Sequence, residues 1–267
     1  LIQNEEINVQ KEEIEAQRDH LEESENLIKQ KNSKLKIANA TKDKFFSIIA
    51  HDLKTPFNSI FGFSSLLKDS YDDFDENEKK SFIDNIDKAS KSAFNLLENL
   101  LMWAMSQQDS IEIEKIDVNL KQFIDNAISP YLQGAKKKNI VFTNAVSDEI
   151  IMALDKQTIK TVIGNLFNNA VKFTPNKGKI TIDAVIVEKF VEIKISDTGV
   201  GIPPKALSKI FRIDENHTTL GTNKEKGTGL GLSLCKEFVE KNGGKIWVES
   251  KIEIGSQFYF TIPYGEL

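Results

Sequence analysis

Cysteine is nearly absent from this chain of 267 residues, in which Cys235 is the only one. A single cysteine excludes an internal disulfide, a CxxC redox pair and a cysteine metal site. Cys235 lies in the segment LSLCKEFVEKNGG, which has the pattern of an amphipathic helix. Because a free cysteine usually behaves as a small buried hydrophobe, we expect it to pack in a core rather than to react.

Long apolar runs and arginine are also scarce. No stretch approaches the roughly 18 apolar residues that cross a bilayer, and no signal peptide is present. Only two of the 35 basic residues are arginines, Arg18 and Arg212, so bidentate guanidinium contacts are possible at two places. The net charge of -5 provides no general basic surface for nucleic acid. We therefore expect a soluble chain without a membrane segment or a direct nucleic-acid partner.

Glycine and proline are missing from residues 1–44, which are rich in Glu, Lys, Gln and Asn. Apolar residues recur there at intervals of seven, which is typical of a coiled coil. They are Ile7, Ile14, Leu21, Ile28 and Leu35. The column three residues earlier is polar throughout, so the segment predicts either a marginal dimeric coil or a solvated single helix. Its start at Leu1, inside a helical pattern, indicates a fragment of a longer protein.

Residues 45–107 have the pattern of two amphipathic helices separated by the polar run KDSYDDFDENEKK. Apolar residues follow the three-and-four spacing of a helix that faces a core, first from Phe45 to Leu67 and then from Phe82 to Ala104. A hairpin of two helices has too small a core to be stable alone. We therefore expect a homodimer in which two hairpins form a four-helix bundle.

The remaining chain alternates helical and strand patterns. Helices are predicted near 119–137, 155–173 and 230–241, and strands near 139–144, 179–188, 190–197, 245–250 and 256–263. This order is typical of an α+β sandwich with one mixed sheet and helices on one face. The predicted multidomain chain consists of a coiled-coil helix (1–44), an all-α hairpin (45–107), a hinge linker (108–113) and the α+β domain (114–267).

His51, in the string FFSIIAHDLKTP, is the first candidate for chemistry. An imidazole attacks through one ring nitrogen only when it is neutral and the proton on the other nitrogen is held by an acceptor. Asp52 follows immediately, and Thr55 lies one helical turn further on. Pro56 removes a backbone donor, so we expect a kink there. His20, in the charged coil, is expected at the surface.

Three further strings, NLFNNAVKFTP, DTGVGIP and GTGLGLSL, follow more than a hundred residues later. Asn165 and Asn169 are four residues apart and therefore on one face of a helix, where amides on an apolar background need partners. Asp197 stands at a strand end beside glycines that let a ligand approach the backbone.

The glycines of the last string precede a helix, so their backbone amides are suited to bind phosphate. The string is neither a P-loop nor a Rossmann fingerprint, because GxxxxGK[ST] and GxGxxG are both missing. A polar segment between Pro203 and Gly227 separates it from the aspartate, and a connection this long in a compact domain is usually functional.

In order and spacing, the four strings resemble the transmitter region of sensor histidine kinases, from roughly residue 41 to 263. That family joins a HisKA-type dimerisation and phosphoacceptor domain to a GHKL-type ATP-binding domain. The resemblance implies autophosphorylation by ATP with Mg²⁺, followed by phosphoryl transfer to an aspartate on a response-regulator receiver domain. It also implies a cytoplasmic location, as the cytosolic part of a larger bacterial sensor that can be membrane-anchored.

The resemblance assigns catalytic roles to four residues. His51 becomes phosphorylated and Asp52 orients and activates its ring. Thr55 positions the water that dephosphorylates the partner, which gives a phosphatase activity. Arg212 meets the γ-phosphate from the segment that resembles the ATP lid, where Leu207 and Ile210 stand in place of the two phenylalanines of the family pattern.

The nucleotide site follows from the same match. Asn169 ligates Mg²⁺, Lys172 reaches the phosphates and Asp197 accepts a hydrogen bond from the adenine amino group. The other expected ATP-binding residues are Asn165, Phe173, Gly199, Gly201, Gly227, Thr228, Gly229, Leu230 and Gly231.

Two other interpretations remain. GHKL ATPases of other classes, such as heat-shock chaperones, gyrases and mismatch-repair proteins, share the ATP strings but do not need a histidine-bearing hairpin before them. A catalytically silent dimeric scaffold, or a transmitter that acts only as a phosphatase, would predict a damaged asparagine or glycine string, and neither is seen.

Overall fold

The computed structural model describes residues 2–107, 113–212, 219–223, 229 and 231–265; some side chains within the N-terminal helix and near residue 103 lie outside this description. The chain divides into two units, Leu1–His51 and Asp52–Leu267, and each is described by itself. The first unit is formed by the N-terminal helix alone.

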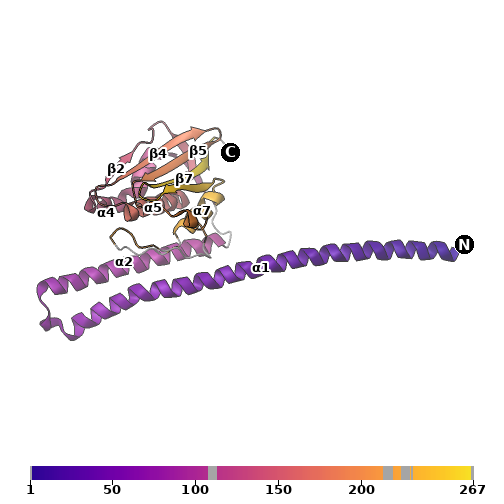
Figure 1. Ribbon diagram of the computed structural model, residues 1–267, viewed down its shortest axis with the longest axis horizontal. Helices are drawn as coiled ribbons and strands as arrows, with labels where there is room; N and C mark the ends of the chain where they lie inside the picture. Colours follow the sequence, from indigo (N-terminus) through magenta and orange to yellow (C-terminus); the bar gives the residue numbers. More distant parts are fainter. Residues whose placement is uncertain (1, 108–112, 213–218, 224–228, 230, 266–267) are drawn as a thin grey trace. The chain divides into compact units, whose positions relative to one another are not determined.

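The N-terminal helix α1 (Ile2–Asp69) runs without interruption from the expected coil into the expected hairpin and through Pro56 (Figure 1). The heptad positions that are described, Ile14, Leu21, Ile28 and Leu35, are between 54% and 68% exposed in the single chain. A hydrophobic column this exposed is available to a second helix. In the part of the chain that the structure describes, no helix is long and apolar enough to span a membrane.

The second helix of the hairpin, α2 (Glu76–Gln107), follows a short 3₁₀ turn, η1 (Tyr71–Asp73). Asp75 caps α2, because its Oδ1 accepts hydrogen bonds from the backbone N–H groups of Asn77 and Glu78 at 2.7 and 2.8 Å. Glu78 returns a bond, its carboxylate accepting from the backbone N–H of Asp75 at 3.0 Å. This reciprocal capping box explains why the helix begins at Glu76, inside the polar run.

Aromatic rings close the hairpin next to the turn. The rings of Phe63 on α1 and Phe82 on α2 stack with centroids 5.5 Å apart. Phe74 meets Phe82 edge-on at 4.9 Å. The predicted helical hairpin is therefore confirmed, and aromatic pairing of this geometry stabilises it beyond simple burial.

The C-terminal α+β part contains a five-stranded mixed sheet in the order β2-β4-β5-β7-β6. Only β2 and β4 pair in parallel; the other neighbours are antiparallel. The strands are β2 (Val141–Asn144), β4 (Lys179–Val187), β5 (Phe190–Asp197), β6 (Ile246–Lys251) and β7 (Gly255–Pro263). The mixed sheet that the sequence predicts is confirmed.

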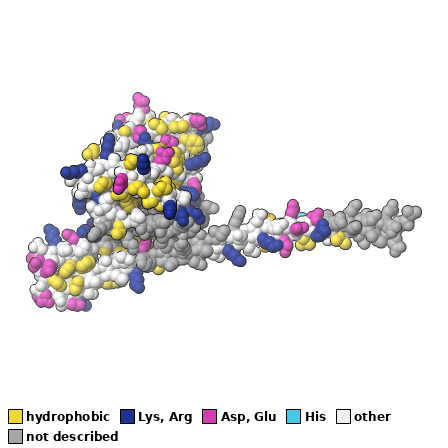
Figure 2. Space-filling model, in the orientation of Figure 1, with side chains coloured by type: hydrophobic (Ala, Val, Ile, Leu, Met, Phe, Trp, Pro, Cys, Tyr) yellow, Lys and Arg dark blue, Asp and Glu magenta, His cyan; other side chains and the backbone are white. Residues whose placement is uncertain are grey.

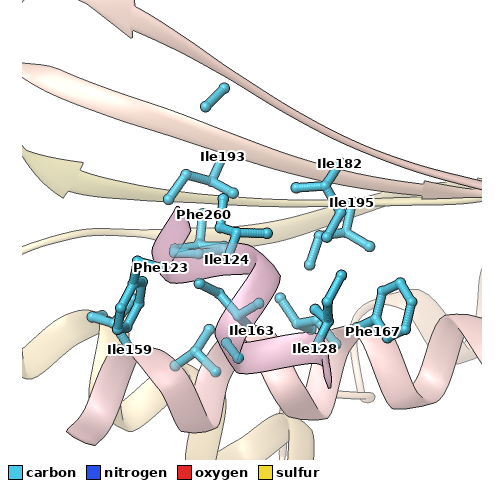
Figure 3. Packing of buried hydrophobic residues seen from close by; sticks show 14 of the residues in the cluster. Phe123, Ile124, Ile128, Ile159, Ile163, Phe167, Ile182, Ile193, Ile195 and Phe260 are labelled. Carbon is cyan, nitrogen blue, oxygen red and sulfur yellow. The ribbon is translucent and has the colours of Figure 1, made fainter. Parts of the chain in front are cut away.

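Helices cover one face of this sheet (Figure 1). They are α3 (Leu120–Ile128), the 3₁₀ turn η2 (Ser129–Tyr131), α4 (Leu132–Lys137), α5 (Lys156–Phe173) and α7 (Gly231–Lys241). A further short helix, α6 (Pro204–Leu207), lies next to the edge strand β6 and buries no residue fully. Figure 3 shows how the core forms between the helices and the sheet: Ile159, Ile163 and Phe167 of α5 and side chains of α3 point toward Ile182, Ile193, Ile195 and Phe260 of the sheet. Cys235 is fully buried in the same core, as expected.

Two details differ from the sequence prediction. The single helix expected over 119–137 is broken into α3, η2 and α4, because Pro130 has no backbone N–H to continue α3. A separate two-stranded antiparallel sheet, β1 (Lys115–Asn119) with β3 (Ile151–Asp155), is not predicted.

Replacement of Phe167 tests the core. Phe167 is fully buried and meets Phe142 edge-on at 5.1 Å. We expect Phe167→Ala to lower the free energy of unfolding by about 3–5 kcal/mol, since it removes buried apolar area and leaves a cavity. Urea unfolding followed by circular dichroism measures this. Ile151→Ala, at a side chain that is 60% exposed, is the control and should change stability by less than about 0.5 kcal/mol; equal losses would contradict the packing.

Candidate functional site

The helix α5 carries the asparagine string, and a buried network fixes its first turn. Asp155 accepts hydrogen bonds from the backbone N–H and hydroxyl of Thr158 at 2.8 and 2.6 Å. Its other oxygen accepts from the backbone N–H of Glu114 at 3.2 Å. The Thr158 hydroxyl also accepts from Asn242, near the end of α7, at 3.0 Å. The start of α5 is thus tied to the first described residues of the α+β part and to α7.

Asn165 and Asn169 lie on the same face of α5 and are both partly buried. Asn165 faces the first turns of α7: a Cβ built on Gly231 would lie 3.2 Å from its Oδ1, and the Cys235 thiol on the same helix donates to the Val162 carbonyl of α5 at 3.8 Å. Burial raises the pKa of that thiol well above its usual range. A side chain at Gly231 would therefore crowd Asn165, which would have to move by a few tenths of an ångström.

Lys172 and Phe173 end α5 one turn beyond Asn169. The Lys172 Nζ donates to the backbone carbonyl of Thr219 at 3.2 Å and lies 4.6 Å from the centroid of the Phe173 ring. The carbonyl of Phe173 accepts from the N–H of Val200 at 3.2 Å. The expected phosphate residue is thereby connected to the segment that resembles the lid, while Phe173 is connected to the DTGVGIP string.

Asp197 stands at the end of β5 as a partly buried carboxylate. Its Oδ1 accepts hydrogen bonds from the backbone N–H of Gly199 at 2.8 Å and of Ser256 at 3.3 Å. Burial raises the pKa of Asp197 to about 6, although these two hydrogen bonds act in the opposite direction. Both bonds go to the same carboxylate oxygen, Oδ1.

The glycines of DTGVGIP are required by close packing of the chain on itself. A Cβ at Gly199 would lie 2.5 Å from Asp197 Oδ1 and 2.7 Å from the Phe173 carbonyl oxygen. Gly201 has a φ of +74° and a Cβ there would collide with the carbonyl of Lys251. These glycines hold the strand end of Asp197 against α5 and β6.

The segment that resembles the lid begins with α6 and docks on the core. Ile210 and Phe211 pack against the buried cluster, and the Phe211 ring meets Phe258 edge-on at 6.4 Å. Arg212 is exposed, and its backbone N–H donates to the carbonyl of Lys209 at 2.9 Å. Of the two residues that stand in place of the family's phenylalanines, Ile210 packs against the core, and Leu207 is partly exposed.

The glycine string is described only in part. Gly229 is exposed with a φ of +72°, and Gly231 begins α7. Gly227, Thr228 and Leu230 lie outside the described residues.

His51 lies in α1, but its side chain is outside the described set. Asp52 is partly buried and Thr55 is exposed on the following turn. The Ser59 hydroxyl donates to the Thr55 carbonyl at 3.3 Å, within a helix that continues through Pro56.

Three residues with contacts at this site are not predicted from the sequence: Ser256, Lys138 and Thr222. Ser256 had a weak signal, because it follows a glycine at the start of a strand. Lys138 was hidden in the run KKK, although it lies three residues after the buried Ala135 and so on the same helical face. Thr222 carried no signal, since a hydroxyl in a polar segment looks like a solvated side chain.

Comparison with known proteins gives two family models. Residues 154–266 match the model described as histidine kinase-, DNA gyrase B- and HSP90-like ATPase, and residues 41–109 match the His Kinase A (phospho-acceptor) domain. The chain is also 32% identical, over 232 residues, to the autoinducer 2 sensor kinase/phosphatase LuxQ of Vibrio vulnificus (strain CMCP6). That match covers 84% of this chain and 26% of LuxQ, so the chain spans about a quarter of that relative's length.

Solved structures agree with these matches. The catalytic domain of histidine kinase ThkA is 32% identical with a TM-score of 0.50, and the match covers 57% of this chain and 98% of that one. ThkA in complex with response regulator protein TrrA gives 28% identity and a TM-score of 0.61, covering 82% of this chain and 61% of that one. The helical region and the α+β region of this chain thus both have counterparts among histidine kinases.

The raised pKa of Asp197 predicts a specific dependence of stability on pH. A carboxyl group whose pKa is about 6 in the folded chain and about 4 in the unfolded chain binds its proton more tightly when folded. Its contribution to stability is therefore most favourable below pH 4, declines between pH 4 and 6, and stays unfavourable above pH 6.

Asp197→Asn removes this penalty and keeps an oxygen for the two backbone donors. We expect the nucleotide-free variant to be more stable than wild type at pH 7.5, by on the order of 1–3 kcal/mol, and to lose most of the difference at pH 4.5. Urea unfolding at both pH values measures this, with Asp117→Asn on an exposed strand position as control. A variant less stable than wild type at pH 7.5 would show that burial does not penalise the carboxylate.

Proposed function

The chain belongs to the sensor histidine kinases, and from this premise we propose that it transfers the γ-phosphoryl group of ATP to His51. The observation that carries the proposal is the joint presence of a histidine followed by an acid in a HisKA helix and of a half-buried carboxylate, Asp197, beside the asparagine helix of an ATP-binding fold. Neither part alone performs phosphoryl transfer.

In the proposed reaction, one ring nitrogen of His51 attacks the γ-phosphorus, a nitrogen–phosphorus bond forms, and the bond to the bridging oxygen of ADP breaks. Asp52 holds the proton on the other ring nitrogen, which keeps the attacking nitrogen unprotonated and stabilises the cationic ring after attack. Little further covalent chemistry is needed, so positioning and charge neutralisation dominate catalysis.

Adenine recognition is proposed to rest on Asp197. Its Oδ1 is held by the N–H groups of Gly199 and Ser256, so Oδ2 is the oxygen that accepts from the adenine amino group. The ionised form accepts best, and the pKa of about 6 keeps Asp197 mostly ionised at neutral pH.

Phosphate binding is proposed to involve the end of α5 and the glycine string. Lys172, which donates to the Thr219 carbonyl in this structure, would transfer its hydrogen bond to a phosphate oxygen. The backbone amides at Gly227, Thr228, Gly229, Leu230 and Gly231 would bind the same group. Arg212 would meet the γ-phosphate, because a charged fork suits the three oxygens of the transferred group.

Mg²⁺ fits the residues present. Within the described ranges, no three or more His, Cys, Asp and Glu side chains gather into a cation site, so a hard cation has to take an amide oxygen, water and phosphate oxygens. Asn169, partly buried beside Asn165 and one turn before Lys172, would supply the amide. When bound, the ion neutralises charge on the phosphates; the chain orients them.

The proposed second reaction passes the phosphoryl group from His51 to an aspartate of a receiver domain. In a separate phosphatase activity, Thr55 would position the water that hydrolyses the aspartyl phosphate and releases inorganic phosphate. The similarity to ThkA, solved with response regulator protein TrrA, supports a partner of this kind. We also propose the functional boundaries 1–44, 45–107, 108–113 and 114–267, for signalling helix, hairpin, linker and catalytic domain.

A homodimer is proposed through the hairpin, which exposes hydrophobic side chains in the single chain (Figure 2). On α1 these are Phe57, Phe61 and Leu66, and on α2 they are Ile83, Phe94, Leu97 and Leu101, all between 45% and 65% exposed. Phe57 with Phe61, and Phe94 with Leu97 and Leu101, follow the helical spacing of three and four residues and form apolar stripes that a second hairpin would bury. In the first unit, the exposed heptad column of α1 offers a second helix an apolar surface of its own.

The dimer is tested by sedimentation equilibrium. We expect the mass of two chains for wild type, because isolated apolar stripes of this size favour association. Leu97→Asp with Phe61→Asp should reduce the mass toward one chain, whereas Val141→Asp, at an exposed position of β2, should leave it unchanged. A wild-type protein that is monomeric at micromolar concentration would contradict the proposed four-helix bundle.

The kinase proposal is tested with γ-labelled ATP and Mg²⁺. We expect label on wild type that is stable in alkali and lost in acid, as a nitrogen–phosphorus bond requires, and no label on His51→Ala or after chelation of Mg²⁺. His20→Ala, in the charged part of α1, is the matched control and should be labelled like wild type. ATP binding without any label would instead favour the scaffold or phosphatase interpretation.

A further inference from the structure

A short described part of the lid segment, residues 219–223, is attached to the end of α5. The Thr222 backbone N–H donates to the Lys172 carbonyl at 3.0 Å. The Thr222 hydroxyl lies 3.1 Å from both the Lys172 and the Thr174 carbonyl oxygens. Gly221 next to it is buried. The segment is therefore held by the same carbonyl end of α5 that carries Lys172.

Lys138 holds the other side of this junction. It is only 3% exposed, and its Nζ donates to the carbonyls of Val171 and Lys172 at 2.9 and 3.0 Å and to the Thr222 hydroxyl at 2.8 Å. The three donors of an ammonium group match these three acceptors. A cation also interacts favourably with the last carbonyls of a helix, where the helix dipole is negative.

The backbone of Lys138 is fixed as well. Its N–H donates to the carbonyls of Gly134 and Ala135 at 3.3 and 3.2 Å, and its carbonyl accepts from the N–H of Lys177 at 2.9 Å. Lys138 thus contacts the chain on both sides of the exit from α5. The two lysines before it, Lys136 and Lys137, are exposed. Lys138 is therefore the one lysine of the run KKK whose side chain is buried.

Packing alone does not explain a lysine at this position. Burial of a charged amine is unfavourable unless hydrogen bonds compensate it, and an apolar side chain of the same length would fill the space. What the amine adds is a bridge between Val171, Lys172 and Thr222, which lie up to 84 residues from it in sequence.

We propose that Lys138 is a positioning residue for phosphate binding, which keeps the carbonyl end of α5 joined to Thr222 while the Lys172 side chain changes partner. This proposal rests on the ATP-binding function proposed above. Lys172 donates to Thr219 in the same anchored segment, and in the proposed function a phosphate takes over that contact. A fixed Thr222 keeps residues 219–223 beside the phosphates when this occurs.

The test compares Lys138→Met, which removes the three donors at similar volume, with Lys137→Met on the exposed neighbour. A second pair compares Thr222→Val, which removes the hydroxyl, with Thr222→Ser, which keeps it. Hydrogen exchange of the Thr222 amide is measured without nucleotide, and equilibrium binding is measured for Mg·ATP and for adenosine. Thermal unfolding of every variant is followed in parallel.

We expect Lys138→Met and Thr222→Val to speed exchange of the Thr222 amide and to weaken Mg·ATP binding by about tenfold each, an ordinary loss for a hydrogen bond to a charged group. Adenosine affinity should not change, because Asp197 is untouched. Thr222→Ser and Lys137→Met should behave like wild type. The double variant should lose little more than either single variant, since both break one bridge.

A purely structural role predicts a different result. If Lys138→Met lowers the unfolding temperature but leaves the Thr222 exchange rate and the ratio of Mg·ATP to adenosine affinity at wild-type values, the positioning proposal is overturned. If Lys138→Met does not fold, the comparison of Thr222→Val with Thr222→Ser tests the proposal through the same ratio of Mg·ATP affinity to adenosine affinity. A wild type that binds neither nucleotide refutes the proposed function instead, and the exchange rates then show independently whether the anchor exists.

Discussion

The burial of one face of α5 is the constraint on which the rest of the α+β part depends. Ile159, Ile163 and Phe167 must pack against the sheet, and this fixes the rotation of the helix about its axis. Because successive residues turn by 100°, Asn165 and Asn169 then have to lie on a side of the helix away from the sheet, where Asn165 faces α7. The polar site is a geometric consequence of the apolar core.

Both ends of α5 are held by polar groups that the core alone does not need. Asp155 caps its start, and Lys138 bonds the carbonyls at its end. These groups satisfy the backbone donors and acceptors that every helix leaves unpaired at its ends. They also connect α5 with the linker side of the domain and with the lid, so that helix termination and site assembly use the same residues.

The Asp197 carboxylate shows that a binding group can reduce the stability of the folded chain when no ligand is bound. Its burial raises its pKa to about 6, which disfavours the charged form in the absence of a ligand. Two backbone N–H groups offset part of that cost and orient the group. A strained or unfavourable group that is kept in place by its surroundings is typical of binding sites.

The sequence by itself determined the helix and strand periods, and with them α2, α5, β4, β5 and the mixed-sheet class, because long periodic segments report which face is buried. It also supplied the four strings and their order. Only the tertiary structure decided that Pro130 breaks a helix, that β1 and β3 form their own sheet, and that Lys138 and Ser256 reach Thr222 and Asp197. Such contacts join residues 59 or 84 positions apart, and local pattern contains no information about which distant atoms will meet when the core closes.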